Sequence, residues 1–296
     1  MPTNHLRDLG VAGFCGSMRA NIIRGLKMML EGKKVIVTGG GSGIGRATCV
    51  LAAREGADVA VADINAETGV ETVNTVKTEG RDAIFIEMDT SKKADALRMA
   101  DETLKAFGTI DGLVCCAIKL VPGRLEELPE EDWDMVMDIG LKGYFLCAQS
   151  VGQTMIKNKS GSIVFVSSIG GMQTYPLAGA YSVCKAGAIM LSKLFGVEWA
   201  AHGIRANTVS PGQVRSPMTE AMFQDPEIAA GRAAVVPMGR VGMPDDIAEG
   251  CVFLLSERAR YITAANLPVD GGQVESKMIH TPGRSWGGKN IEYKAD

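Results

Sequence analysis

Histidine is scarce in this chain, and cysteine does not occur in the spacings that mark a metal site. Only three histidines are present among 296 residues, which argues against a zinc site. The seven cysteines form no C-x-x-C pair, and most of them lie in apolar strand or helix patterns. Such cysteines are typical of small buried side chains in a reducing compartment. We therefore predict no metal site, no disulfide and a cytoplasmic location.

Charge blocks and long apolar runs are missing as well. The net charge is -3, with acidic and basic residues scattered along the chain and no basic block, which argues against a nucleic-acid partner. No apolar run approaches the length of a membrane span, so we predict no membrane partner. A hydrophobic fraction of 46% is enough for a sizeable core. The partner that we expect is a small-molecule substrate.

A glycine-rich loop organises the chain. Residues 35–38 form an apolar strand pattern and residues 46–55 a helix pattern, and between them Gly39, Gly43 and Gly45 are spaced G-x-x-x-G-x-G. A strand, a glycine loop and a helix together offer backbone N–H groups and a positive helix end to a pyrophosphate. Glycine suits this loop because a Cβ would keep the phosphates away. The spacing does not fit G-x-G-x-x-G in any register.

From residue 35 to residue 269, strand patterns alternate with helix patterns. The expected strands are 35–38, 59–63, 83–89, 112–117, 161–167, 204–209 and 267–269. The expected helices are 46–55, 66–78, 92–107, 131–157, 180–201 and 244–256, and the segment 211–238 is looser. Continuous apolar strands between helices predict an α/β protein with a single-domain doubly wound Rossmann fold, in which helices cover both faces of a parallel seven-stranded sheet.

The two ends of the chain lie outside this pattern. We assign residues 30–273 to one dinucleotide-binding and catalytic domain, preceded by an extension, 1–29, and followed by a tail, 274–296. The extension is either unstructured chain or a result of the choice of start site, since Met28 and Met29 are possible starts. The alternative is an amphipathic helix over residues 18–30 that docks on the body or on a partner subunit. The tail either covers a pocket or is disordered.

Asp63 closes the second expected strand, 18 residues beyond Gly45. An acid at this place accepts hydrogen bonds from the adenosine ribose hydroxyls, and its charge repels a 2′-phosphate. Asp63 therefore predicts NAD rather than NADP as the cofactor. The alternative is an acid that only caps the helix beginning at Ala66.

Tyr181 and Lys185 lie four residues apart on an expected helix, so they share one face. A phenol with a pKa near ~10 is a poor base at neutral pH, and an ammonium beside it lowers that pKa. Ser168 ends the fifth expected strand, where the ligand crevice of such a sheet lies. The Tyr–Lys pair is a weak signal by itself; together with the glycine loop and Ser168 it predicts a catalytic set.

These motifs, in this order, resemble those of the classical short-chain dehydrogenase/reductase family over about residues 30–273. The resemblance implies a secondary alcohol and a ketone interconverted with NAD, in which Tyr181 exchanges the hydroxyl proton, Ser168 holds the oxygen and Lys185 binds the nicotinamide ribose. The cofactor-binding positions that it implies are Gly39, Ser42, Gly43, Ile44, Gly45, Asp63, Asp89, Thr90, Cys116, Ala117, Tyr181, Lys185, Pro211, Gly212, Val214 and Ser216. It also implies a homodimer or homotetramer built on the two longest helices.

The chain departs from the family pattern at two places. Where the family usually carries Asn-Asn-Ala-Gly after the fourth strand, this chain has Cys115-Cys116-Ala117-Ile118, which removes hydrogen bonds between strands. Where the family has a catalytic Asn in the long helix, this chain has Gly140. We expect Gly140 to leave room for water that links Lys185 to the solvent. The alternative is a catalytically silent NAD-binding protein that acts through association.

The substrate is poorly specified by the sequence. Side chains in the loop after Ser168 and in the segment 217–238 are expected to line a flexible, mainly apolar pocket, namely Met172, Gln173, Tyr175, Met218, Met222, Phe223 and Met238. The alternative for each of them is ordinary packing. Lys119 either meets an anionic group of the substrate or is an ordinary solvated lysine.

Overall fold

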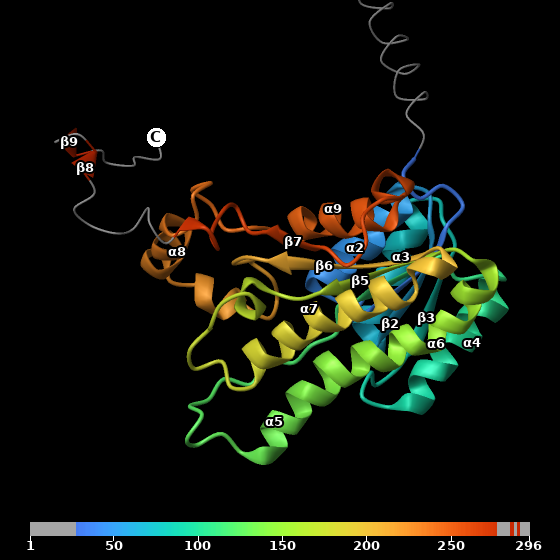
Figure 1. Ribbon diagram of the computed structural model, residues 1–296, viewed down its shortest axis with the longest axis horizontal. Coiled ribbons are helices and arrows are strands. Elements are labelled where there is room, and N and C mark those ends of the chain that lie inside the picture. Colours follow the sequence, from blue (N-terminus) through green and yellow to red (C-terminus); the bar gives the residue numbers. More distant parts are fainter. Residues whose placement is uncertain (1–27, 277–284, 287–288, 291–296) are drawn as a thin grey trace, which may run out of the picture.

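In the computed structural model seven strands pair in parallel, in the order β3-β2-β1-β4-β5-β6-β7 (Figure 1). Their bounds are β1 Lys34–Thr38, β2 Asp58–Asp63, β3 Ala83–Glu87, β4 Gly112–Cys115, β5 Gly161–Val166, β6 Ile204–Pro211 and β7 Asn266–Val269. The central residues of β1, β2, β4 and β5 are mostly apolar and buried because helices cover both faces of the sheet. The predicted Rossmann fold is confirmed.

The structure describes residues 28–276, 285–286 and 289–290. Within the tail, β8 Ser285–Trp286 and β9 Lys289–Asn290 pair antiparallel. The predictions for residues 1–27 and for the remainder of the tail lie outside the described residues.

Two layers of helices enclose the sheet (Figure 1). On one face lie α2 Gly43–Arg54, α3 Ala66–Thr78 and α9 Pro244–Leu255; on the other lie α4 Lys93–Phe107, α6 Gly143–Asn158 and α7 Tyr181–Glu198. Strand side chains that point to opposite faces join separate apolar cores, as Val35 and Val37 do on the α2 side and Ile36 on the α6 side.

The strand order reverses between β1 and β4, which are neighbours although β2 and β3 intervene in the chain. At such a reversal the loops that leave the two strands run in opposite directions and leave a crevice at the carboxyl ends of the strands. The glycine loop after β1 and the Cys116–Ala117 segment after β4 meet at this point. The fold therefore brings the predicted cofactor residues to one edge of the sheet.

The helix predicted over residues 131–157 is not one continuous α-helix. It consists of α5 Glu130–Met137, a π-helical segment, Asp138–Lys142, and α6. The Thr90 hydroxyl donates a hydrogen bond to the Ile139 carbonyl across 3.4 Å, and a Cβ at Gly143 would lie 2.9 Å from the Thr90 carbonyl oxygen. The wide turn thus packs closely against the loop after β3. Such turns interrupt the regular helical ladder, frequently at functional sites.

The looser segment after β6 contains a helix that the sequence pattern did not predict, α8 Pro226–Ala234. The Asp225 carboxylate accepts hydrogen bonds from the N–H groups of Glu227 and Ile228, at 2.8 and 3.4 Å. Pro226 occupies the first turn, where its missing N–H costs nothing. Asp225-Pro226-Glu227 is therefore the start signal of α8.

The cysteines behave as the sequence predicts within the described residues. Cys49, Cys115, Cys147, Cys184 and Cys251 are buried and free, and Cys116 is half-buried and free. No helix in the described part of the chain is both long and apolar enough to span a bilayer. The cytoplasmic location stays a prediction.

Candidate active site

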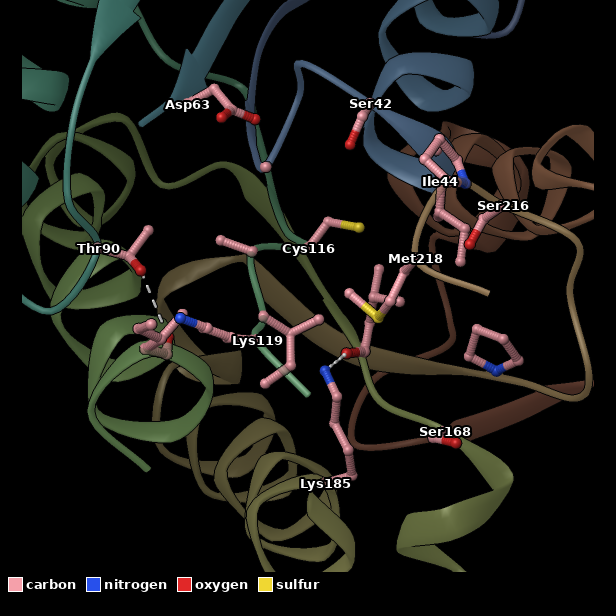
Figure 2. A pocket seen from close by; sticks show the side chains of 18 of the residues that line it. Ser42, Ile44, Asp63, Thr90, Cys116, Lys119, Ser168, Lys185, Ser216 and Met218 are labelled. Carbon is pink, nitrogen blue, oxygen red and sulfur yellow. Dashed lines mark hydrogen bonds between the residues drawn. The ribbon is translucent and has the colours of Figure 1, made fainter. Parts of the chain in front are cut away.

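A cavity of about 540 Å³ lies at the carboxyl edge of the sheet, within the range usual for small-ligand sites. It is lined by all the predicted site residues except Gly45: Gly39, Ser42, Gly43, Ile44, Asp63, Asp89, Thr90, Cys116, Ala117, Ser168, Tyr181, Lys185, Pro211, Gly212, Val214 and Ser216. In Figure 2, Asp63 and Ser42 lie toward one end of the cavity, and Lys185 and Ser168 lie toward the other. The two predicted functions, cofactor binding and catalysis, therefore share one cavity.

Gly45 lies beneath the cavity rather than in its wall. A Cβ at this residue would lie 2.0 Å from the Gly39 carbonyl oxygen, so α2 could not approach β1 with any other residue there. Gly39 has a φ of +68°, and a Cβ there would lie 2.9 Å from the Ala117 Cα. These two glycines fix the close packing of the loop against both central strands.

The N-terminus of α2 faces the cavity. Ser42, the residue before the helix, makes no capping hydrogen bond with its side chain. Gly43 has a φ of +51°, and a Cβ there would point into the gap in front of Ser216 and Pro217, 3.6 Å from a side-chain carbon of each. Helix N–H groups and the positive end of the helix dipole suit a phosphate at this gap. The loop therefore fits the pyrophosphate of a dinucleotide.

Asp63 is fixed by backbone N–H groups. Its Oδ2 accepts a hydrogen bond from Gly41 at 2.8 Å, and its Oδ1 accepts one from Asn65 at 2.9 Å. The carboxylate thus ties β2 to the glycine loop and still lines the cavity. Its neighbour Arg46 donates to the Gly41 carbonyl at 3.0 Å and pairs with Glu71 at 2.7 Å. The positive charge of Arg46 is therefore paired with the Glu71 carboxylate.

Cys115 at the end of β4 and Cys116 just after it do not disrupt the pairing of the strands. The Cys116 N–H donates to the Thr38 hydroxyl at 3.2 Å, so Thr38 links β1 to the start of the loop. Cys115 is buried in β4, while Cys116 lines the cavity. Burial raises the pKa of the Cys116 thiol to about 11, so it stays protonated at neutral pH. The Thr38 hydroxyl thus contacts the backbone of residue 116, while the thiol side chains supply none of the amide hydrogen bonds of the family pattern.

Ser168 ends the segment after β5 and turns its hydroxyl into the site. Its Oγ accepts a hydrogen bond from the Gly170 N–H at 2.9 Å and caps a short 3₁₀ turn, Ile169–Gly171. A side-chain hydrogen bond joins Ser168 to the phenol of Tyr181, which begins α7. The Ser167 hydroxyl donates to the Lys185 carbonyl at 2.7 Å and holds the first turns of α7 against β5. The three predicted catalytic side chains are therefore brought together.

The pKa of Tyr181 is raised to about 12, chiefly by burial, and the hydrogen bond with Ser168 opposes that rise. The expectation that Lys185 brings this pKa below its ordinary value is therefore wrong for the chain by itself. Removing a phenol from water disfavours the phenolate, and the nearby neutral thiols give no compensation.

Lys185 is buried, and its Nζ has two fixed partners. It donates to the Val166 carbonyl at 2.8 Å, a bond drawn in Figure 2, and to the Tyr144 hydroxyl at 3.1 Å. Burial lowers the pKa of this ammonium. Sequence reasoning missed Tyr144; its only signal is a phenol four residues after Gly140 on the same helical face.

The space beside Gly140 is filled by protein, so the expected water site is wrong. A Cβ at Gly140 would lie 2.3 Å from the Ile118 Cδ1 and 2.6 Å from the Cys184 Sγ. Ile118 packs there against a buried cluster that includes Val136 and Cys184. The two departures from the family pattern, a larger residue at 118 and a smaller one at 140, therefore meet in space.

The predicted substrate residues are only partly gathered. Met218 lines the cavity, and so does the exposed Lys119. The other predicted residues, Met172, Gln173, Tyr175, Met222, Phe223 and Met238, are not among its lining. Sequence reasoning did not place Met135 and Ile139 in the wall, because the π-helical segment that turns them toward the site was not foreseen.

Comparison with known proteins gives consistent matches across the body of the chain. The model of the family described as enoyl-(acyl carrier protein) reductase matches residues 39–273. The chain belongs to the short-chain dehydrogenase/reductase family. Its predicted family is confirmed, and the chain is an oxidoreductase of the dehydrogenase/reductase type.

Three relatives show the extent of this similarity. The 2,5-dichloro-2,5-cyclohexadiene-1,4-diol dehydrogenase LinX of Sphingobium indicum is 36% identical over 82% of this chain and 96% of its own length. The structure of an NAD+-bound xylitol dehydrogenase has a TM-score of 0.78 and 29% identity, covering 82% of this chain and 99% of its own. A protein from Agrobacterium tumefaciens with bound NADP has a TM-score of 0.77 and 33% identity, covering 84% and 99%.

The contact between Ile118 and Gly140 predicts that Gly140→Ala destabilises the fold. Overpacking of this kind costs about 1–3 kcal/mol, measured as the free energy of unfolding in urea. The same change in an Ile118→Ala background should cost less, because the nearest obstructing atom is gone. Gly231→Ala in α8 is the control, since nothing lies within 4 Å of its Cβ position. Equal costs at residue 140 in both backgrounds would contradict the packing described here.

Proposed function

We propose that the protein is an NAD(H)-dependent enzyme that interconverts a secondary alcohol and a ketone, with Tyr181 as the general acid and base. The observation that supports this most is the convergence of Ser168, Tyr181 and Lys185 at one end of a cavity whose other end carries the glycine loop and Asp63. The diol and xylitol dehydrogenases among the relatives favour an alcohol as the substrate.

In the oxidation direction the Tyr181 oxygen takes the proton of the substrate hydroxyl. The Ser168 oxygen accepts the Gly170 N–H, and its hydroxyl proton, which faces Tyr181 in the chain by itself, would turn to the substrate oxygen when a substrate is bound. The bound nicotinamide supplies the acceptor for the hydride that leaves the carbinol carbon, and the donor in reduction. In reduction Tyr181 returns the proton to the substrate oxygen as the carbonyl becomes an alcohol.

Lys185 supplies a positive charge in a region from which water is largely removed. Its Nζ lies 5.8 Å from the centre of the Tyr181 ring. The positive charge of an oxidised nicotinamide bound in the same cavity adds to that of Lys185, and both favour the phenolate over the phenol. Because the pKa of Tyr181 is high in the chain by itself, its phenolate is scarce near neutral pH. The two positive charges are therefore needed to increase the fraction of phenolate.

The choice of NAD over NADP rests on Asp63 and its surroundings. Backbone N–H groups hold both carboxylate oxygens in place, so the negative charge cannot swing away from a ribose phosphate. Arg46, the nearest arginine of α2, is engaged with Glu71 and with the Gly41 carbonyl. A 2′-phosphate here would meet a fixed carboxylate without this arginine to balance it.

The joint lining of one cavity by Ser168, Tyr181 and Lys185 favours the enzyme over the catalytically silent alternative, although Gly140 leaves the family's catalytic Asn without a counterpart. The two departures from the family pattern that favour this alternative are Gly140 and the Cys115–Cys116 pair. Gly140 is packed against Ile118, and Thr38 joins the strands beside Cys116. Neither departure removes a group from the set of Ser168, Tyr181 and Lys185.

We also propose that copies of the chain associate through α6 and α7. On these helices the apolar side chains of Leu146, Val151 and Phe195 are buried within the subunit. Other apolar side chains of α7 are exposed: Val183 51%, Met190 58%, Leu194 52% and Val197 71%. An apolar strip of this kind is typical of a surface covered by a second copy.

The position of Asp63 predicts that the dissociation constant for NAD is lower than that for NADP by at least about tenfold. Asp63→Ala should narrow the gap, because the like-charge repulsion disappears. Calorimetry or quenching of tryptophan fluorescence measures both affinities, and Asp101→Ala on the exposed side of α4 is the control. NADP binding as tight as NAD binding in the unchanged protein would refute the assignment.

Tyr181 predicts the pH dependence of the reaction. A group with a raised pKa holds its proton to higher pH, so alcohol oxidation should accelerate as the pH rises through the alkaline range, while ketone reduction slows. Tyr181→Phe should lower kcat by about 10²–10⁴ with nearly unchanged NAD affinity. Absorbance of NADH over a panel of secondary alcohols measures this, and the exposed Tyr261→Phe is the control. Full turnover in Tyr181→Phe would exclude the mechanism.

The exposed strip on α7 predicts a dimer or tetramer at micromolar concentration. Leu194→Glu together with Val197→Glu should shift it toward the monomer, because two carboxylates would have to be buried in the interface. Light scattering after size-exclusion chromatography measures the mass. Leu125→Glu, at a residue 74% exposed in the loop after β4, should leave the mass unchanged. A monomeric unchanged protein would contradict this assembly.

A further inference from the structure

Tyr144 is a buried phenol for which the proposed reaction has no use. It lies in the second position of α6, and its side chain is fully buried. Its hydroxyl donates a hydrogen bond to the Val166 carbonyl at 3.0 Å and accepts one from the Lys185 Nζ at 3.1 Å. A buried hydroxyl with both bonds made is rigid. Tyr144 is therefore part of the setting of Lys185.

The ammonium of Lys185 is held by two oxygen atoms, one from the backbone and one from a side chain. Its Nζ donates to Val166 as well as to Tyr144, and it lies 5.1 Å from the centre of the Tyr144 ring and 5.8 Å from that of Tyr181. An ammonium has three N–H donors. Two of them are engaged by these oxygens, and one remains for the cavity that Lys185 lines.

The helix turn before Tyr144 offers Lys185 no polar partner. Gly140 has no side chain, and Ile118 and Cys184 occupy the place where one would stand. The cluster there consists of apolar residues such as Val136 and Ala180. Tyr144 lies four residues further along the same helical face and is the first hydroxyl on that face to reach the ammonium.

We propose that Tyr144 is a positioning residue, which keeps Lys185 charged and directed into the cavity beside Tyr181. This inference rests on the proposed function in so far as Lys185 assists Tyr181. The other titratable groups that face Lys185 are the thiols of Cys115 at the end of β4, of Cys116 after it and of Cys184 on α7. Burial raises the pKa of each thiol, so none carries a charge near neutral pH that could replace the hydroxyl of Tyr144.

Removing the Tyr144 hydroxyl should change the pKa of Lys185 in a definite direction. The ammonium loses an acceptor while Val166 remains, so the charged form of Lys185 becomes less favourable and its pKa falls. A lysine that carries less charge supports the Tyr181 phenolate less, so the pH at which alcohol oxidation reaches half its maximum rises. A residue with a merely structural role would lower the rate equally at every pH.

The experiment compares Tyr144→Phe with Tyr261→Phe, a matched loss of a hydroxyl at a fully exposed site. Lysine labelled with ¹³C at Cε gives the titration midpoint of Lys185 by NMR in protein without added ligand, with Lys185→Met to assign its signal. In Tyr144→Phe we expect this midpoint to fall by about one pH unit, which corresponds to a tenfold change in the protonation equilibrium. The oxidation profile should move to higher pH by a similar amount. Tyr261→Phe should change neither.

Each outcome bears on one proposal. An unchanged Lys185 midpoint and an unchanged pH profile in Tyr144→Phe overturn the positioning role, even if the enzyme oxidises alcohols with NAD. A lowered midpoint in a protein that oxidises no secondary alcohol overturns the proposed function and leaves the hold on Lys185 in place. Tyr144→Met, which keeps an apolar side chain and lacks the hydroxyl, must give the same midpoint shift, so a folding defect of one variant does not decide the result.

Discussion

The contact between the start of α2 and the end of β1 sets the rest of the site. The Gly45 Cα lies so close to the Gly39 carbonyl that a Cβ would stand 2.0 Å from that oxygen. This approach lets the loop turn tightly, presents the N-terminus of α2 to the cavity and brings the Gly41 N–H within 2.8 Å of Asp63. This end of the cavity is therefore shaped by close backbone packing and by the Asp63 carboxylate that accepts the Gly41 N–H.

Much of the fold and of the candidate site could be predicted from the sequence, because the patterns that indicate them lie within short segments of the chain. Strands buried on both faces are continuous apolar runs, and the residues that follow them lie at one edge of the sheet by topology. Asp63 and Ser168 were placed in this way. The π-helical segment Asp138–Lys142 could not be predicted in this way, since it packs against Thr90 in the loop after β3, which is distant in the sequence. The α8 helix was missed although Asp225 carries its capping signal.

The hydrogen bond between Tyr144 and Lys185 could not be predicted from the sequence either. Tyr144 and Lys185 are 41 residues apart, and nothing in either neighbourhood points to the other. The same holds for Ile118 and Gly140. In the sequence, Ile118 and Gly140 are two separate positions at which the usual residue of the family is replaced. In the structure, the Ile118 side chain occupies the volume beside Gly140 in which a side chain at residue 140 would lie. Departures from a family pattern at two positions are thus a single change in packing, which appears only when both are placed.

The strand order has a consequence for the thermodynamics of the molecule. The cavity takes its walls from residues 39 to 219, on both sides of the reversal between β1 and β4. No contiguous half of the chain carries the binding surface, so a ligand has affinity only for the completed sheet. Binding is then linked to the unfolding of the whole body, and a ligand at a hundred times its dissociation constant adds about 2.7 kcal/mol to global stability. The thermal midpoint of the entire domain, and not the order of one loop, becomes the measure of occupancy.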